Sequence, residues 1–336
     1  MDFMRDIAEW CMPFLYFLEG IRNPVFDFIF ALITHLGEET FFLVVAILFF
    51  WCIDKRQGYF ILLTGLIGTV VNQFAKLFFR IPRPWVLDKN FDIIEAAREE
   101  ATGYSFPSGH TQNIAGTYGA IAAHNHKRWK TILCVTIIVL VAFSRMYLGV
   151  HTPLDVVVSL LIALGLVLAL RPCFATEEGF KNSMPYIVIG SVILSVVFLV
   201  YVNSVAGDST LDPTNLKSAM KNAYTLLGCT AGLVLVYFVD IKCVNFKTEG
   251  RWYAQIIKLA IGLGGVLAIK SGLSKPLVSL FGDEYIARAV RYFLIVGFAG
   301  ALWPLTFAWF GKLRIGFMER FTSWVVGKFA ELKEEK

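Results

Sequence analysis

The chain has 336 residues, of which 57% are hydrophobic and only 17% are charged. Soluble globular proteins contain about 25% charged residues, so this chain has too little charge to cover a globule of its size. The composition, with a mean hydropathy of +0.63, excludes a soluble enzyme, a disordered chain and a coiled coil, and predicts an all-α, polytopic integral membrane protein.

The segment 1–19 is the first predicted element. It contains Asp2, Asp6 and Glu9, and no small-residue cleavage site follows, so it lacks the pattern of a secretory signal peptide. Apolar side chains recur along it at helical spacing: Phe3, Ile7, Trp10, Cys11, Phe14, Leu15 and Leu18. We therefore expect an amphipathic helix that lies at the membrane surface.

Ten apolar segments follow, most of them long enough to cross a bilayer at about 20 residues per span. They are 24–36, 38–53, 57–79, 108–125, 130–150, 153–170, 184–204, 218–239, 253–272 and 288–310. The first two are short, and we expect them to return the chain to the side on which it started, either as two thin spans or as a re-entrant hairpin. His35 lies near the outer end of the first segment, from which it could approach a headgroup site.

Basic residues predict which ends of the segments face the cytoplasm. Lys and Arg gather in four connections on one side: 54–56, 126–130, 242–251 and 312–314. The acidic connections 85–106 and 203–217 lie on the other side, where 270–291 is the one basic exception. We therefore expect both termini in the cytoplasm. The formal net charge of +5 is interpreted as this topology signal, and no nucleic-acid partner is expected.

A first cluster of charge closes the third apolar segment. Lys76 lies near the end of this helix, and Pro82 disfavours helix in the residue before it, so the helix should stop near Ile81. Arg83 follows between two prolines. Two cations near one helix end can hold an anion that has several oxygens; the alternative is that they snorkel to the interface. Arg80 shares a helix face with Lys76 and is either a further phosphate contact or a snorkelling residue.

A second cluster is the run YSFPSGH, residues 104–110. Pro107 and Ser108 are typical of a helix start, where unpaired backbone N–H groups form a phosphate site. Gly109 would let an anion approach the backbone closely, and His110 stands beside that position. The alternative is an ordinary Ser/Pro helix cap with an incidental histidine.

A third cluster is the run SRMYLGVHTPLD, residues 144–155. Thr152 is expected to cap a helix whose first residue is Pro153, which places Asp155 in the first turn. Asp155 can then reach back to His151, fix its tautomer and leave the other ring nitrogen free as a nucleophile. Arg145 supplies a third cation. The alternative for Asp155 is simple helix capping.

The later segments contain no comparable cluster. Gly228-x-x-x-Gly232 permits close helix packing, either in a homodimer or within the chain. The six cysteines form no CxxC pair and are expected to be free thiols. In the tail, one helical face carries Leu313, Phe317, Phe321, Trp324 and Val325.

Together the clusters read K-x6-R-P, P-S-G-H and S-R-x5-H-x3-D, in that order, over 76–155. This tripartite pattern resembles the type-2 phosphatidic-acid phosphatase family of membrane lipid phosphatases, and no defining position departs from it. The resemblance implies a six-helix phosphatase core at 20–172. About four further transmembrane helices then form an extension at 183–310, and an amphipathic, charged tail follows at 311–336.

The resemblance also implies a role for each motif residue. His151 would be the nucleophile that forms a phosphohistidine, Asp155 would orient it, and His110 would be the general acid and later the base for water. The expected phosphate ligands are Lys76, Arg83, Ser108, the Gly109 backbone and Arg145. Because three cations would take the place of Mg²⁺, no metal and no cofactor are expected.

The resemblance implies a membrane phosphatase. The distribution of charge predicts that its site faces the extracellular or periplasmic side of the plasma membrane. Its substrate would be a polyprenyl diphosphate, phosphatidic acid, phosphatidylglycerophosphate or a sphingoid-base phosphate. Two enzymatic alternatives stay open: hydrolysis of a soluble sugar phosphate, as in the glucose-6-phosphatase branch, and phosphotransfer from lipid to lipid. A lipid-phosphate transporter is disfavoured, because His110, His151 and Asp155 are all present.

Overall fold

A computed structural model describes residues 2–124 and 127–334, with side chains from Phe3 to Val325. His126, which belongs to a predicted basic connection, and the last two residues of the predicted tail lie outside the described residues. The first half of the chain forms α1 (Asp2–Trp10), α2 (Met12–Gly20), α3 (Pro24–Thr34), α4 (Glu39–Leu48), α5 (Lys55–Phe79), α6 (Pro84–Leu87), α7 (Gly109–His124), α8 (Arg128–Tyr147) and α9 (Pro153–Ala175). The second half forms α10 (Glu177–Ser204), α11 (Pro213–Val239), α12 (Trp252–Gly272), α13 (Ser274–Phe281), α14 (Glu284–Gly297), α15 (Phe307–Lys312) and α16 (Gly316–Glu334).

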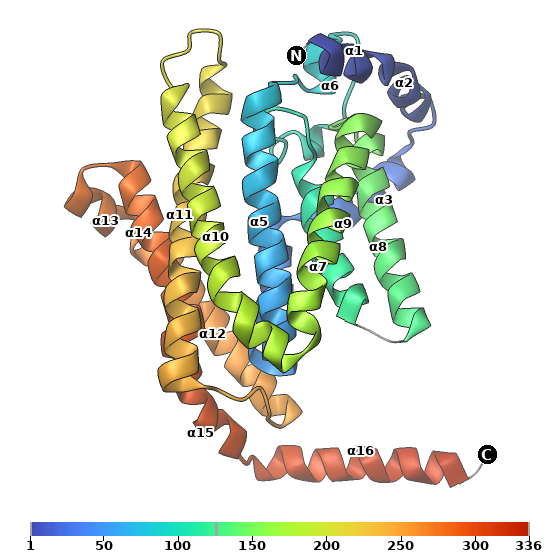
Figure 1. Ribbon diagram of the computed structural model, residues 1–336. Coiled ribbons are helices and arrows are strands. Elements are labelled where there is room, and N and C mark those ends of the chain that lie inside the picture. The colour runs from blue at the N-terminus through green and yellow to red at the C-terminus, as the bar shows by residue number, and fades with distance from the viewer. Residues whose placement is uncertain (1, 125–126, 335–336) are drawn as a thin grey trace.

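The described part of the chain is a bundle of helices without a strand (Figure 1). Seven of its helices are long and apolar enough to cross a membrane, and the bent pair α3 and α4 makes an eighth if it counts as one span. The predicted all-α, polytopic membrane fold is thus confirmed. Six helices, α3, α4, α5, α7, α8 and α9, occupy the predicted core, and α10, α11, α12 and α14 follow it.

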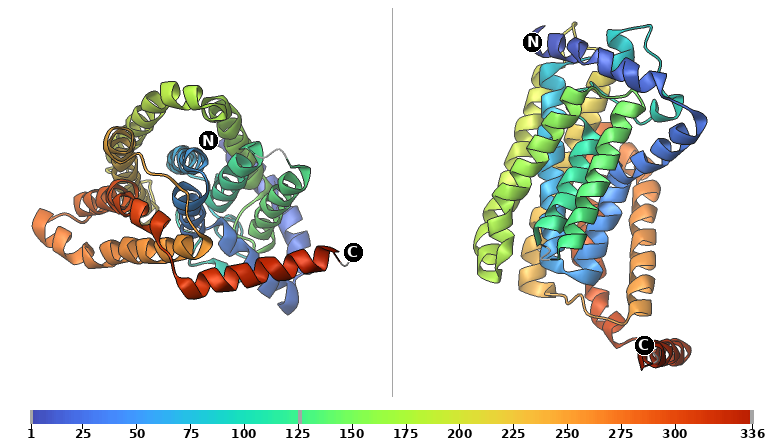
Figure 2. Two further views of the ribbon diagram at one scale, coloured as in Figure 1. Left: turned by 90° about the horizontal axis from the view of Figure 1, so that it is seen from below. Right: turned by 90° about the vertical axis from the view of Figure 1, so that its right-hand side faces the viewer.

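Helix α5 occupies the centre of the bundle and packs against both the core and the extension (Figure 2, left). In the span that contains it, 61% of the most apolar window is buried, against 22–39% in the other six spans. A helix that is apolar on all sides can be buried on all sides. This central position lets residues at the end of α5 contact loops from several other helices.

The first two apolar segments do not return the chain to its starting side. Helices α3 and α4, each continued by a short helix, form the stretches Pro24–Gly37 and Glu39–Ile53, which meet at a bend of 53°. At 1.5 Å per residue each stretch is only about 20 Å long, and the two follow one another as parts of one crossing. Figures 1 and 2 place the N-terminal helices and the start of α5 at opposite ends of the bundle.

The two termini consequently lie at opposite ends of the molecule, and the prediction that both face the cytoplasm is wrong. At the end that contains the N-terminal helices, Tyr16 of α2 donates to Asp88 Oδ2 (2.8 Å). At the other end α16 packs against the start of α12, where Trp252 Nε1 donates to Thr322 Oγ1 (3.0 Å). The error came from counting the two short segments as an even number of crossings.

The N-terminal segment forms two helices where one amphipathic helix was expected. The chain breaks at Cys11 because Pro13 favours the first turn of a new helix. Helix α2 buries Leu15 and Leu18, whereas Trp10 at the end of α1 is 81% exposed. These two helices cover the end of the bundle at which the three motifs lie.

The extension packs on itself and on α5. Helix α14 approaches α11 so closely that a Cβ on Gly228 would lie 2.2 Å from the carbonyl oxygen of Ala289. Gly232 similarly faces Val296. The Gly-x-x-x-Gly motif therefore serves packing within the chain. All six cysteines are free, as expected.

Candidate active site

The three sequence clusters converge on one cavity of about 240 Å³ inside the bundle. The predicted residues that line it are Lys76, Arg83, Gly109, His110, Arg145 and His151. The residues that were not predicted are Glu39, Gln73, Glu100, Thr102, Asn113 and Asn222. Asn222 belongs to α11, so the extension contributes directly to this cavity.

Lys76 lies on the last turn of α5 and is only 6% exposed. Its Nζ donates to the carbonyl oxygens of Tyr104 (2.6 Å) and Ser105 (3.1 Å). The helix ends at Phe79, slightly earlier than the following proline predicts, and the next residue takes a left-handed conformation. Lys76 thus ties the loop of the second motif to α5 while its charge stays beside the cavity.

Arg83 is equally buried and also donates hydrogen bonds to the same loop. Its Nε donates to Gly103 O (3.2 Å) and its Nη2 to Thr102 O (2.8 Å). Its Nη1 donates to Val150 O and lies 2.9 Å from Nε2 of His151. The two prolines that flank Arg83 hold it outside the helix, where one guanidinium can contact two loops at once.

His151 and Asp155 form the predicted pair, since Nδ1 lies 3.2 Å from Oδ2 of the carboxylate. The same oxygen accepts from the Thr152 N–H (2.8 Å) and from Ser105 Oγ (2.5 Å). Because a carboxylate only accepts and a guanidinium only donates, these contacts assign the ring proton to Nδ1 and leave a lone pair on Nε2, which faces Arg83. Asp155 makes both of the contacts that the sequence suggested, because it pairs with His151 and also completes the capping box of α9.

The charge state of His151 follows from its surroundings. The side chain is 2% exposed. Burial, and then the charges of Arg83, Lys76 and Arg145, hold the pKa of His151 well below its ordinary value. A neutral ring at physiological pH is the form that can act as a nucleophile.

Arg145 lines the cavity and is the third cation of the site. Its side chain is 0% exposed, and Nη1 donates to Thr34 Oγ1 (2.6 Å). Its Nε and Nη2 are buried and have no hydrogen-bond partner among the described residues. A buried charged donor without an acceptor is costly, and an anion in the cavity would remove this cost by supplying the acceptor.

His110 lies at the start of α7, where its Nε2 is 3.2 Å from Glu100 Oε2. The other oxygen of Glu100 is 3.4 Å from Nδ1 of His35, which also contacts Glu38. The minor expectation that His35 approaches the site is thus met. Sequence reasoning missed both glutamates, although Glu38 beside an apolar segment is the kind of ionisable residue that marks a site.

His35, Glu38 and Glu100 also form a group that could hold a metal ion, because their ligand atoms lie within 4.8 Å of one another. One imidazole and two carboxylates are a donor set that divalent metals use in proteins. The expectation that catalysis needs no metal is untested by this geometry and stays a prediction.

Two predicted residues lie elsewhere than expected. Ser108 is buried, its N–H donates to Asp155 O (3.2 Å), and its Oγ accepts from Thr111 Oγ1 (3.0 Å). It therefore joins α7 to α9 and is not among the residues that line the cavity. Arg80 neither snorkels nor reaches the cavity, because its Nη1 donates to Asp208 Oδ2 (2.8 Å) in the extension.

Comparisons with known proteins bear on the whole arrangement. The family model "PAP2 superfamily" matches residues 57–178, which contain all three motifs. Phosphatidylglycerophosphatase B of Bacillus subtilis is 32% identical over 178 residues, which cover 49% of this chain and 79% of that protein. The chain belongs to the PAP2 superfamily. The family resemblance of the three motifs is thereby confirmed.

A second family model, "PAP2 superfamily phosphatase, transmembrane extension", matches residues 224–314 of this PAP2 chain. A probable sphingosine-1-phosphate phosphatase of Dictyostelium discoideum is 28% identical over 213 residues, which cover 57% of this chain and 51% of that protein. The chain thus spans about half the length of that relative. Undecaprenyl-diphosphatase BcrC of Bacillus subtilis is 30% identical over 148 residues, covering 43% of this chain and 72% of that protein.

Proposed function

We propose that this protein is a membrane phosphatase that hydrolyses a lipid phosphate or diphosphate through a phosphohistidine on His151. The observation that supports this most is the pair of unpaired nitrogens on buried Arg145, in a cavity shared with Lys76, Arg83 and His151, whose Nε2 is unprotonated. Three cations around a nucleophilic nitrogen suit a phosphoryl group, whose oxygens can accept from all of them.

In the first step Nε2 of His151 attacks phosphorus, and the bond from phosphorus to the leaving oxygen breaks. Asp155 keeps the proton on Nδ1 and stabilises the imidazolium that forms. His110, oriented by Glu100, donates a proton to the leaving oxygen. In the second step His110 accepts a proton from water, which attacks the phosphohistidine and releases inorganic phosphate.

The three cations act on the transition state rather than on the proton transfers. Negative charge spreads over the equatorial oxygens as the phosphoryl group moves. Lys76 and Arg83 are already fixed by the loop carbonyls that they hold, so they need no reorganisation during the reaction. The open donors of Arg145 supply the hydrogen bonds that the protein itself leaves unmade.

A lipid substrate is supported by the three relatives, since each is named as an enzyme that acts on a lipid phosphate or diphosphate. It also fits a cavity inside a helical bundle, near one end of the membrane spans. The basic connections lie at the opposite end, so we propose that the site opens toward the outer face of the cell membrane. The N-terminal helices would then lie on that face too.

The test is phosphate release by the protein in vesicles and in detergent, with a panel of lipid phosphates and with glucose-6-phosphate. We expect His151→Ala and His110→Ala each to lower turnover of a lipid substrate by at least about 10³-fold. His124→Ala, at the far end of α7, is the matched control and should keep full activity. Wild-type turnover in the His151 variant, or activity with glucose-6-phosphate alone, would refute the proposal.

A further inference from the structure

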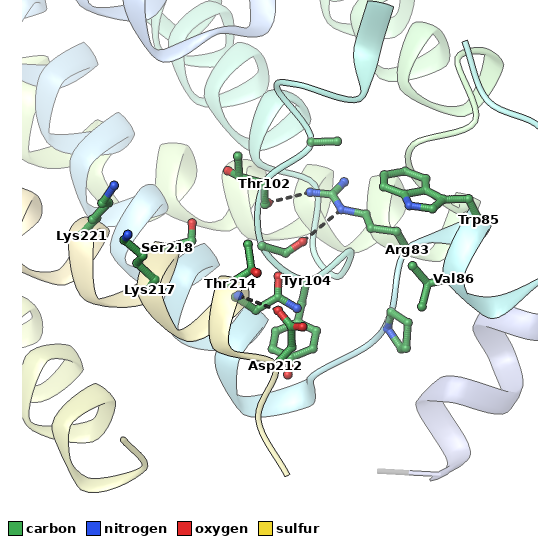
Figure 3. Close-up of a pocket in the computed structure, with 14 residues that line it drawn as sticks. Arg83, Trp85, Val86, Thr102, Tyr104, Asp212, Thr214, Lys217, Ser218 and Lys221 are labelled. Atoms are coloured by element: carbon green, nitrogen blue, oxygen red, sulfur yellow. Dashed lines mark hydrogen bonds between the residues drawn. The ribbon is translucent and has the colours of Figure 1, made fainter. Parts of the chain in front are cut away.

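A second pocket of about 750 Å³ adjoins the catalytic cavity at the junction between core and extension. Arg83 and Thr102 line both spaces. Figure 3 shows Arg83 and Trp85 on one side of this pocket and Lys217 and Lys221 on the other, with the loop of Thr102 and Tyr104 between them. The catalytic cavity and this pocket therefore share part of one wall.

The charges of the pocket favour an anion. Lys217 is exposed, and within the described part of the chain no carboxylate lies within 4.0 Å of its amine. Lys221 has only a long contact of 3.9 Å with the exposed Glu284. Asp212 is the one acidic residue among the described residues that line the pocket, and its Oδ1 accepts from Asn215 N (2.8 Å) to cap α11.

The lysines are placed by the geometry of α11. Lys217, Ser218 and Lys221 lie on one face at spacings of three and four residues. The next residue, Asn222, lines the catalytic cavity itself. One helix of the extension thus faces both the reacting group and the space next to it.

We propose that Lys217 and Lys221 form a second anion subsite, and that the preferred substrate carries two phosphoryl groups. This deepens the proposed function and rests on it. In a lipid diphosphate, Nε2 of His151 bonds to the terminal phosphorus and the bond from that phosphorus to the bridging oxygen breaks. The leaving group is then a lipid monophosphate, protonated by His110 and held by the two lysines.

The same chemistry is offered by a phospholipid whose headgroup ends in a second phosphate. A sphingoid-base phosphate differs, because its ammonium group would lie near two cations and be repelled. The charge on the leaving group grows in the transition state, so the lysines should raise kcat as well as affinity for a substrate with two phosphates.

The experiment compares matched substrates in the full-length protein: farnesyl diphosphate with farnesyl monophosphate, and phosphatidylglycerophosphate with phosphatidic acid. The readout is the ratio of kcat/KM within each pair. In the double variant Lys217→Ala, Lys221→Ala this ratio should fall roughly ten- to hundredfold, as expected for lost charge-assisted hydrogen bonds. Lys275→Ala, an exposed lysine of α13 outside the pocket, should leave the ratio unchanged.

The outcomes separate the two proposals. A fall confined to the farnesyl pair assigns the subsite to a diphosphate, and a fall confined to the phospholipid pair assigns it to a headgroup phosphate. An unchanged ratio in both pairs, or an equal fall with Lys275→Ala, overturns the subsite while hydrolysis itself still supports the phosphatase. Lys217→Glu is a second variant on an exposed position; if it does not lower the ratio further than Lys217→Ala, the subsite is also refuted.

Discussion

The core and the extension each bury a cation fully, and the surroundings of these two side chains, Arg145 and Lys258, differ. In the core, Arg145 keeps two buried donors without a partner, beside a cavity. In the extension, Lys258 is 1% exposed and donates to Trp51 O (2.8 Å), with its amine 4.2 Å from the ring centroid of Phe307. Asp240 is likewise buried and pairs with Lys55 of α5 (2.9 Å).

This difference separates two uses of buried charge in one membrane protein. A buried ion whose partners are complete attaches one element to another. A buried ion with open donors has a cost that a bound ligand can remove. By this criterion Lys258 and Asp240 attach the extension to the core at the end opposite the motifs. Arg145, in contrast, has donors that the proposed substrate would occupy. The contribution of α11 to the cavity is the point where the two regions meet.

Among the substitutions that test this difference between the core and the extension, Arg145→Lys should have the largest effect. It keeps the charge but removes the planar fork to which the unpaired Nε and Nη2 belong. We expect kcat/KM for a lipid phosphate to fall by about 10²-fold. Arg98→Lys is the control, because Arg98 is exposed and pairs with Glu95 in an outer loop. Equal activity of the two variants would show that the open donors of Arg145 do not bind the phosphoryl group.

The pH profile tests the same cations through His151. Burial and the charges of Arg83, Lys76 and Arg145 lower its pKa, and attack needs the neutral ring. As pH falls, kcat/KM should therefore hold until well below pH 6.5 and then fall about tenfold per unit, when His151 gains a proton. Lys258→Met should leave this acid limb in place. An acid limb at pH 6.5 in the wild-type protein would contradict the assigned environment.

The sequence was sufficient where the chemistry is local. Thr152, Pro153 and Asp155 form a helix start within four residues, so the orientation of His151 could be predicted from them. The motif order likewise placed Lys76 and Arg145 correctly. Ser105 and Glu100 could not be found in this way, because each meets its partner, Asp155 or His110, through the folding of a long loop.

The errors lie where topology or long-range partners decide. The two short apolar segments 24–36 and 38–53 fit a hairpin and a bent crossing equally well, and only packing around the bend decides between them. Arg80 has the spacing of a phosphate ligand, but its partner Asp208 is 128 positions away. The same holds for α11, whose lysines belong to no motif and line the neighbouring pocket only through tertiary packing.

Lys258→Met should have a smaller effect, on the free energy of unfolding, and it tests how the extension is attached to the core. The variant leaves Trp51 O without its donor, so the free energy of unfolding should fall by about 1–3 kcal/mol. Thermal unfolding in detergent measures this, and turnover per folded molecule should stay within about twofold of wild type. A loss of turnover beyond tenfold at unchanged stability would make Lys258 part of the catalytic region rather than an attachment.

The smallest expected effect is that of a chelator. If Lys76, Arg83 and Arg145 supply the positive charge that phosphoryl transfer needs, then removing divalent cations should change kcat by less than about twofold. The competing possibility has a defined place, because His35, Glu38 and Glu100 could hold a metal beside His110. EDTA would then lower the activity, and added Mg²⁺ or Zn²⁺ would restore it. If His35→Ala also abolished this sensitivity to EDTA, the core would use a metal as well as its cations. If EDTA has no effect and His35→Ala keeps full activity, no metal acts at this group. Glu100 then keeps the role of orienting His110.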